Sequence, residues 1–305
     1  MNNNTNKNNN NTNKNKIKRE TKLQELKRRL FANKSATLGL AVLVLFVICA
    51  ILAPLLAPND PLKVDLSNSL KPGFWSDEGV EGMPLGTDYH GRCILSRILY
   101  GTRISLSVGL IAVGIALLFG IPIGVAAGYY GGWVDSVLMR IADIMFAFPA
   151  LLLAIVIVAC IGYGLDKTMI ALGIVYTPQM ARIIRSSVLY IKGMEYIEAE
   201  HAIGSSNSRI ILHHVLPNSV APIIVYSTLT LATAILDCAA LGFLGLGAQP
   251  PSPEWGAILS NSRHFIVCKA WWAATFPGLA ILFSVLGLNL LGDGLRDILD
   301  PRLKT

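Results

Sequence analysis

Few residues in this sequence have the types and spacing that chemistry requires. The adjacent pair His213–His214 is the nearest approach to a catalytic or metal-binding cluster. Neighbouring residues of a helix point to different faces, so two adjacent histidines seldom bind one metal ion, and a structural role is favoured. His90 and Cys93 are three residues apart, but two ligands on an exposed loop favour a metal site only weakly.

The sequence also lacks the common motifs of catalytic and nucleotide-binding sites. It contains no GxxxxGK[ST] loop to hold phosphates, and no GxSxG, HExxH or GxGxxG. The five cysteines show neither a CxxC nor a Cys/His cluster with metal-ligand spacing. We therefore predict no catalytic residue and no metal site, and the chain does not hydrolyse ATP by itself.

One acidic residue lies within a long apolar stretch, "LATAILDCAALGFLGLG", as Asp237. An ionised carboxylate in the middle of a membrane costs several kcal/mol unless it is paired or hydrated, so Asp237 is a candidate for a translocation pathway. The alternative is an aspartate that faces a helix bundle and hydrogen-bonds a neighbouring helix, and both interpretations stay open. Arg140 and Asp143, three residues apart, predict a local ion pair.

The composition indicates a membrane protein. Hydrophobic residues make up 53% of the 305 residues, charged residues only 15%, and the mean hydropathy is +0.53. Soluble domains carry about 25% charged residues. Residues 1–37 are rich in Asn and hold ten Lys/Arg against two acids, which predicts a disordered tail on the cytoplasmic side. The tail lacks the interleaved aromatics of nucleic-acid-binding segments, so no nucleic acid is expected.

Six apolar stretches predict an all-α membrane protein with six transmembrane helices and both termini in the cytoplasm. The first, 38–57, is uncharged over 20 residues, about 30 Å of helix. The fourth is the weakest because Gln179, Arg182 and Arg185 lie in or beside it. The stretches are 38–57, 104–129, 138–161, 168–184, 220–242 and 271–291.

This arrangement divides the chain into five parts. An extracytoplasmic loop is expected at 58–103, a transmembrane core at 104–291 with a cytoplasmic loop at about 190–217, and a cytoplasmic tail at 292–305. The remaining parts are the tail at 1–37 and the first transmembrane helix at 38–57. Gly120, Gly124 and Gly128 recur on one helix face and predict a close helix–helix contact, while Pro122 predicts a kink.

The inner loop contains "EYIEAEHAIGSSNSRIILHHVLPN", residues 195–218. Glu198, Ala199, Ala202 and Ile203 suggest a short helix that Gly204 ends or turns. Residues 205–214 form a second short helix, and Pro217 suits the first turn of the next one. The prediction is a helix–turn–helix that projects from the bilayer and is small enough at its tip to enter a groove on another protein.

These residues resemble the EAA motif of ABC importer permeases. Glu200 replaces the usual second Ala, and His214 stands where Ile is common. The residues on the pattern are Glu198, Ala199, Gly204, Leu216 and Pro217.

Longer stretches narrow the resemblance to the dipeptide/oligopeptide/nickel permeases. "PLGTDYHGRCILSRILYGTRISLSVG" (84–109) resembles their signature, with Cys93 in place of an Asp, and 241–259 and 276–303 match the same group. Cys238 stands where this group usually has Glu, and Asp237 supplies an acid one residue earlier. The outer-loop signature resembles that of the second of two paired permeases, the C-type partner.

The resemblance implies the transmembrane domain of a type I ABC importer in a prokaryotic plasma (inner) membrane. A homologous B-type permease, two ATPase subunits and an extracytoplasmic solute-binding protein are the implied partners, besides the lipid bilayer. ATP and Mg would be bound by the ATPases, and this chain would hold no cofactor. Glu198, Ala199, Glu200, Gly204, Leu216 and Pro217 would couple it to an ATPase subunit. The implied solutes are peptides or nickel and metal-chelate complexes.

Two other functions would require residue patterns of their own. A stand-alone secondary transporter or channel would use Asp237, but it needs a coupling-ion site that usually contains several intramembrane acids. An intramembrane enzyme would need a paired nucleophile and base or a metal motif. Neither pattern is present in this sequence.

Overall fold

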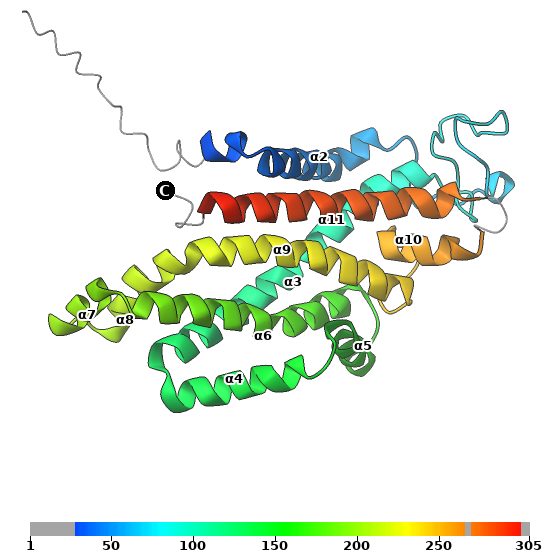
Figure 1. The fold of residues 1–305 in the computed structure, drawn as a ribbon. Helices are drawn as coiled ribbons and strands as arrows, with labels where there is room; N and C mark the ends of the chain where they lie inside the picture. The colour runs from blue at the N-terminus through cyan, green and yellow to red at the C-terminus, as the bar shows by residue number, and fades with distance from the viewer. Residues whose placement is uncertain (1–27, 266–269, 300–305) are drawn as a thin grey trace, which may run out of the picture.

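The computed structural model describes residues 28–265 and 270–299, and within these ranges the chain is helical with no β-strand (Figure 1). The nearest approach to a strand is one isolated bridge between Thr87 and Cys93. Of the predicted disordered tail, 1–37, residues 1–27 lie outside the described residues, as does the end of the chain from 300. Residues 28–32 are helical and the first long helix begins at Lys34, so the prediction is wrong for this part. The side chain of Asn33 caps that helix by accepting from the N–H of Ala36, before the apolar stretch begins.

Two helices from opposite ends of the chain run side by side along one edge of the molecule. α2 (Lys34–Leu56) packs against α11 (Trp272–Leu299). Their backbones approach closely at Gly39, where an added Cβ would lie 2.4 Å from the backbone nitrogen of Leu291. The other face of α2 exposes large aliphatic side chains, as expected for a helix in contact with lipid.

Three further helices form the centre of the bundle: α3 (Ile94–Tyr130), α6 (Leu165–Lys192) and α9 (Leu216–Phe243). The predicted glycine contact is confirmed, because all three glycines face α6. Gly120 faces Met180, Gly124 faces Ala181 and Ile184, and Gly128 faces Val188. Helix α3 continues through Pro122 and begins ten residues before the predicted span.

The early start of α3 has a physical reason. Its first turns carry Ser96, Arg97 and Thr102, which are polar yet buried, so they are helical without being apolar. A prediction based on hydropathy places them in the preceding loop because it detects only the apolar part of the helix.

The predicted third span, 138–161, is not one straight helix. The structure has α4 (Gly132–Phe146) and α5 (Ala150–Ile161), bent by 91° with respect to each other. Pro149 lies at the break, and a proline disfavours helical geometry in the residue before it. At about 1.5 Å per residue, neither helix alone reaches across a bilayer.

Four helices of the described chain are long and apolar enough to cross a membrane, or five if α4 and α5 count as one bent span. They are α2, α3, α11 and the run 207–243, which joins α8 (Asn207–Ile210), a π-helical turn (Ile211–Val215) and α9. Helix α6 has 28 residues but is more polar, which is the weakness expected for the fourth stretch. The shorter elements are α7 (Glu195–Ala202), α10 (Trp255–Ser262), η1 (Leu66–Asn68) and η3 (Arg263–Phe265).

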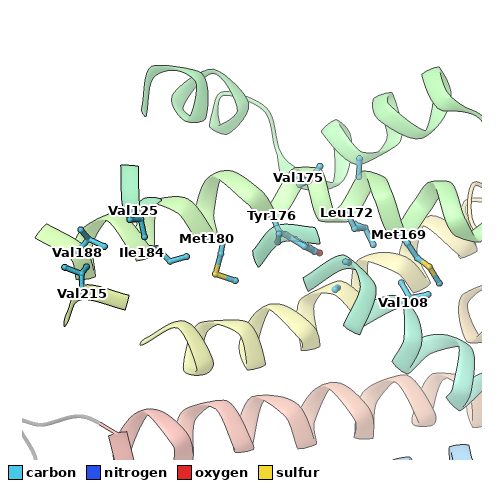
Figure 2. Close-up of a cluster of buried hydrophobic side chains, with 14 of the residues drawn as sticks. Val108, Val125, Met169, Leu172, Val175, Tyr176, Met180, Ile184, Val188 and Val215 are labelled. Atoms are coloured by element: carbon cyan, nitrogen blue, oxygen red, sulfur yellow. The ribbon is translucent and has the colours of Figure 1, made fainter. Parts of the chain in front are cut away.

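The main hydrophobic core lies where α3, α6 and α9 meet. Figure 2 shows Val108 and Val125 of α3 with Met169, Leu172 and Ile184 of α6 in this cluster. The same cluster continues to Val188 and Val215, close to the short helices α7 and α8. The core therefore links the middle of the bundle to the base of the segment that follows α6.

At the opposite end, the loop between α2 and α3 folds against the bundle. The indole N–H groups of two tryptophans donate to backbone oxygens there: Trp272 to Thr87 and Trp255 to Ile98. Trp75 of the loop packs against the rings of Trp271, Trp272 and Phe276. This loop is therefore part of the folded domain.

Candidate functional site

The segment between α6 and α9 forms a helical projection at one end of the bundle, which we call the prong (residues 195–215; Figure 1). Helix α7 forms one limb, while α8 and the π-helical turn form the other. Gly204 lies between them with φ +81°, a left-handed conformation that a β-branched residue rarely adopts. The predicted helix–turn–helix is present, although its second helix starts at Asn207 and continues into α9.

The prong has a buried base and an exposed tip. Ile197, Ile210 and Val215 are fully buried in the main core cluster. At the tip, the Ile203 side chain is 77% exposed, and a Cβ at Gly204 would meet no atom within 4 Å. An exposed isoleucine on a rigid turn is suited to insertion into a groove on another protein.

The predicted coupling residues are divided between these two parts. Glu198, Ala199 and Gly204 are exposed, and Glu200 is half-buried. Leu216 and Pro217 instead form the first turn of α9, and Leu216 packs against the core. The structure thus brings four of the six residues to the projecting limb and its turn, and places two at its attachment to the bundle.

Glu200 joins the two limbs of the prong. Its Oε2 accepts a hydrogen bond from the Ser205 hydroxyl, and its Oε1 lies 3.3 Å from Nε2 of His214. The hydrogen bond from Ser205, followed by the charges of His214 and Arg209, lowers the pKa of the Glu200 carboxyl. Both departures from the usual EAA sequence, Glu200 and His214, therefore meet in one contact, which we call the limb brace.

A second contact ties the prong to α3. The Tyr129 hydroxyl donates to Oδ1 of Asn207 at 2.9 Å and lies 3.5 Å from Nε2 of His201. Lys192, at the end of α6, donates to the backbone oxygen of Tyr129 at 2.7 Å. Sequence reasoning missed Tyr129 because its partners are more than 60 residues away and no local pattern connects them.

The other candidate residues have different surroundings from those predicted. Asp143 pairs with Arg182 of α6 at 2.6 Å, so the expected local pair with Arg140 is wrong. The reason is geometric, because α4 lies along α6 (Figure 1). Arginines of α6 therefore reach the aspartates of α4. Arg185 pairs in the same way with Asp135 of α4.

Neither pair of possible metal ligands, His90 with Cys93 or His213 with His214, is arranged to bind one ion. Cys93 is buried directly before α3, while His90 lies in the preceding turn, so they do not share a helix face. His213 is exposed and His214 contacts Glu200. Within the described ranges, no group of three or more His, Cys, Asp or Glu residues is arranged to hold a metal ion.

Asp237 lies on α9 at the boundary with α6. Its Oδ2 accepts a hydrogen bond of 2.7 Å from the hydroxyl of Tyr176, a buried residue of α6. Figure 2 shows the Tyr176 side chain extending from α6 with the hydroxyl oxygen at its end. This is the interhelical hydrogen bond that the structural interpretation predicted, but the carboxylate is only half-buried and keeps one oxygen free for a further donor.

The fold and these sites define a class of protein: a multi-pass membrane domain with a projecting helical loop and a polar group within its spans. The methionine ABC transporter MetNI, solved in an inward-facing conformation, has the same fold. The match has a TM-score of 0.56 and 20% identity, and covers 67% of this chain and 97% of that chain.

Sequence comparisons identify the family. Residues 120–305 match the model of the binding-protein-dependent transport system inner membrane component, and residues 21–72 match the N-terminal TM domain of oligopeptide transport permease C. The chain belongs to this family of inner-membrane transport subunits.

Curated relatives match over most of the chain. The dipeptide transport system permease protein DppC of Alkalihalophilus pseudofirmus is 50% identical, over 92% of this chain and 90% of that protein. The di/tripeptide transport system permease protein DppC of Pseudomonas aeruginosa is 46% identical, over 92% and 93% respectively.

Proposed function

We propose that this chain is the C-type permease of a binding-protein-dependent ABC importer for short peptides. The observation that carries the proposal is the prong, a braced helical element with an exposed tip on a membrane bundle of this family. Peptides are favoured over nickel or metal chelates because relatives at 46–50% identity are named for di- and tripeptide transport. The chain forms one half of the pathway, and a homologous B-type permease forms the other.

The proposed topology has six membrane crossings, with both termini and the prong in the cytoplasm and residues 57–93 outside. Helix α6, the fourth crossing in chain order, is added to the five candidate spans. Its Arg182 and Arg185 pair with Asp143 and Asp135 of α4, which lowers the cost of placing these cations near the bilayer. Lys192 at the end of α6 agrees with a cytoplasmic position for the prong.

The proposed coupling mechanism follows from the continuity of the helices. The prong enters a cleft on one of two ATPase subunits, which bind ATP and Mg, with Glu198, Ala199, Glu200 and Gly204 at or near the contact. Its second limb runs without a break from residue 207 into the helix that ends at 243. Because this is one long rod, displacement of the tip tilts α9, and the pathway opens to alternate sides.

The roles of Leu216 and Pro217 in this proposal differ from those of the tip. Both residues lie in the first turn of α9, where Leu216 contacts the core. They fix the angle between the prong and the rod instead of contacting the ATPase.

Reconstitution tests the proposal. The chain is purified with a B-type permease, two ATPase subunits and a binding protein encoded with it, and placed in vesicles. We expect ATP-dependent accumulation of labelled di- and tripeptides, with no competition by nickel. Accumulation in vesicles that lack the ATPase subunits would instead support a stand-alone transporter, and competition by nickel would reassign the solute.

A further inference from the structure

The carboxylate of Asp237 has no cationic partner in the described part of the chain. Its recorded polar contact is the hydroxyl of Tyr176, and no Lys, Arg or His of the described residues forms an ion pair with it. The other titratable groups nearby are Tyr226, Cys238 and Glu254, none of which is a cation at neutral pH. An intramembrane carboxylate in such surroundings needs a cation or a proton from elsewhere.

Asp237 lies at the edge of the face of α9 that the described helices cover, because Ala234 and Leu241 on the same side are buried while other neighbours are exposed. Leu236, directly before it, is 48% exposed, and Leu244, two turns later, is 54% exposed. The same helix carries a series of hydroxyl side chains that hydrogen-bond their own backbone: Ser227, Thr228, Thr230 and Thr233. A half-buried carboxylate beside hydroxyls is poorly suited to lipid and well suited to a polar path.

A cavity of about 870 Å³ lies toward the prong end of the same helix boundary. It is lined by α6, α9 and α11, with Tyr190, Asn218 and Arg296 among its polar groups. Tyr226 also lines this cavity and packs against the core cluster that contains Tyr176. Asp237 follows Tyr226 by eleven residues, about 16 Å along the helix. Polar groups thus continue from the cavity toward Asp237.

We propose that Asp237 binds the cationic ammonium group of the solute as it passes through the membrane, and that Tyr176 positions the carboxylate. This inference rests on the proposed function as a peptide permease. The Tyr176 hydroxyl donates to Oδ2, which fixes the carboxylate and leaves Oδ1 for an incoming N–H group. An ammonium group fits better than a metal ion because one carboxylate and one phenol provide too few ligands for a metal.

The test compares two complexes that share the same binding protein and ATPases. Uptake of a dipeptide with neutral side chains is measured in vesicles for the wild type and for Asp237→Asn, at pH 6.5 and at pH 9.5. The α-amino group of a peptide has a pKa of about 8, so it is charged at the first pH and neutral at the second. The ratio of the two uptake rates removes the contribution of the binding protein, which is common to both.

We expect the wild type to exceed Asp237→Asn by roughly tenfold at pH 6.5, as for the loss of a hydrogen bond to a charged group. The ratio should fall toward one at pH 9.5. Thr233→Val, one turn earlier on α9, serves as the control and should give a ratio that does not change with pH. A ratio for Asp237→Asn that is equal at both pH values would overturn the inference.

A second variant covers the case in which Asp237→Asn does not assemble. Tyr176→Phe keeps the carboxylate but removes the donor that orients it, so we expect a smaller, few-fold ratio with the same dependence on pH. A Tyr176→Phe ratio without pH dependence would also count against the inference. If wild-type vesicles take up no peptide in an ATP-dependent manner, the proposed function fails instead.

Discussion

The two ends of the molecule are built in different ways. At the end that carries the loop 57–93, polar side chains are buried and make several hydrogen bonds each, and the chain folds back on the helices. At the other end, the prong exposes most of its residues and is held by a small number of polar contacts. The comparison separates a part that maintains the fold from a part that is free to meet a partner.

Arg97 is central to the loop end. Its Nη1 donates to the backbone oxygen of Pro61 at 3.1 Å and, more weakly, to that of Pro251, while its Nε lies 3.6 Å from Oδ2 of Asp88. Arg92 pairs with the same carboxylate oxygen at 2.7 Å. One guanidinium therefore joins the loop after α2, the start of α3 and the loop before α10.

Glu254 has a similar role beside it. Its carboxylate accepts hydrogen bonds from the backbone N–H groups of Gly256 and Ala257 and caps α10. Burial raises the pKa of Glu254, whereas the hydrogen bonds from these two N–H groups lower it, with a net rise. Charged groups buried at this end are thus bound to backbone, and removing one leaves several partners unsatisfied.

The largest expected effect comes from Arg97→Ala. The substitution leaves the backbone oxygens of Pro61, Pro251 and Ser252 without a donor and opens a cavity, which should cost about 3–5 kcal/mol of unfolding free energy. We expect a strong loss of folded protein in detergent, measured by thermal unfolding and by size-exclusion chromatography.

Arg103→Ala is the matched control for this change. Arg103 lies on the same helix, is exposed, and has no recorded hydrogen bond or ion pair among the described residues. Its replacement should change the unfolding free energy by less than about 0.5 kcal/mol. Equal melting temperatures for the two variants would show that the loop end is not held by Arg97.

The sequence could predict much of the prong and little of the loop end. The prong is local, so Gly204 and the spacing of apolar residues over 195–218 suffice to indicate a helix–turn–helix. The contacts of Arg97 join segments more than 150 residues apart, and no periodicity records them. The same limit applies to Arg182, whose ion-pair partner Asp143 lies on α4, 39 residues away in the sequence.

Gly204→Val tests the exposed end and should have the next largest effect. Valine disfavours the left-handed conformation at this position, at a cost of about 1–3 kcal/mol, and the turn would rearrange. Because a Cβ at Gly204 would meet no atom within 4 Å, the bundle should stay folded. We expect at least a tenfold loss of ATP-dependent uptake with unchanged thermal unfolding.

Gly204→Asn distinguishes the two reasons for such a loss. Asparagine has a similar size to valine but tolerates the left-handed region. If Gly204→Asn retains uptake and Gly204→Val does not, the backbone conformation at this position is what matters. If both variants lose uptake, the partner leaves no room for a side chain. Full uptake in both would separate the prong from coupling.

Tyr129→Phe weakens the attachment of the prong to α3 and should have a moderate effect. Without the hydroxyl, Asn207 loses its donor and the second limb is less firmly held. We expect a few-fold lower ratio of peptide transported to ATP hydrolysed, because tip movement is transmitted less completely. Tyr130→Phe is the control, since the neighbouring tyrosine is 58% exposed and has no recorded hydrogen bond among the described residues. An equal fall in both variants would contradict a specific role for Tyr129.

The limb brace should give the smallest effect, and one that depends on pH. Because the contacts with Ser205, His214 and Arg209 lower the pKa of Glu200, their contribution is present above the ordinary pKa of about 4.5 and is lost as the pH falls through the lowered value. At pH 7, Glu200→Gln should accelerate hydrogen exchange at the Ser205 amide about twofold, as expected for an exposed contact. The difference from the wild type should vanish once the pH falls well below the lowered pKa of Glu200, where the carboxyl is protonated. Glu195→Gln removes the same charge from α7 without touching the turn, so it should leave exchange at Ser205 unchanged. If both variants accelerate exchange equally, the effect comes from the charge of the helix and the brace does not hold the limbs together.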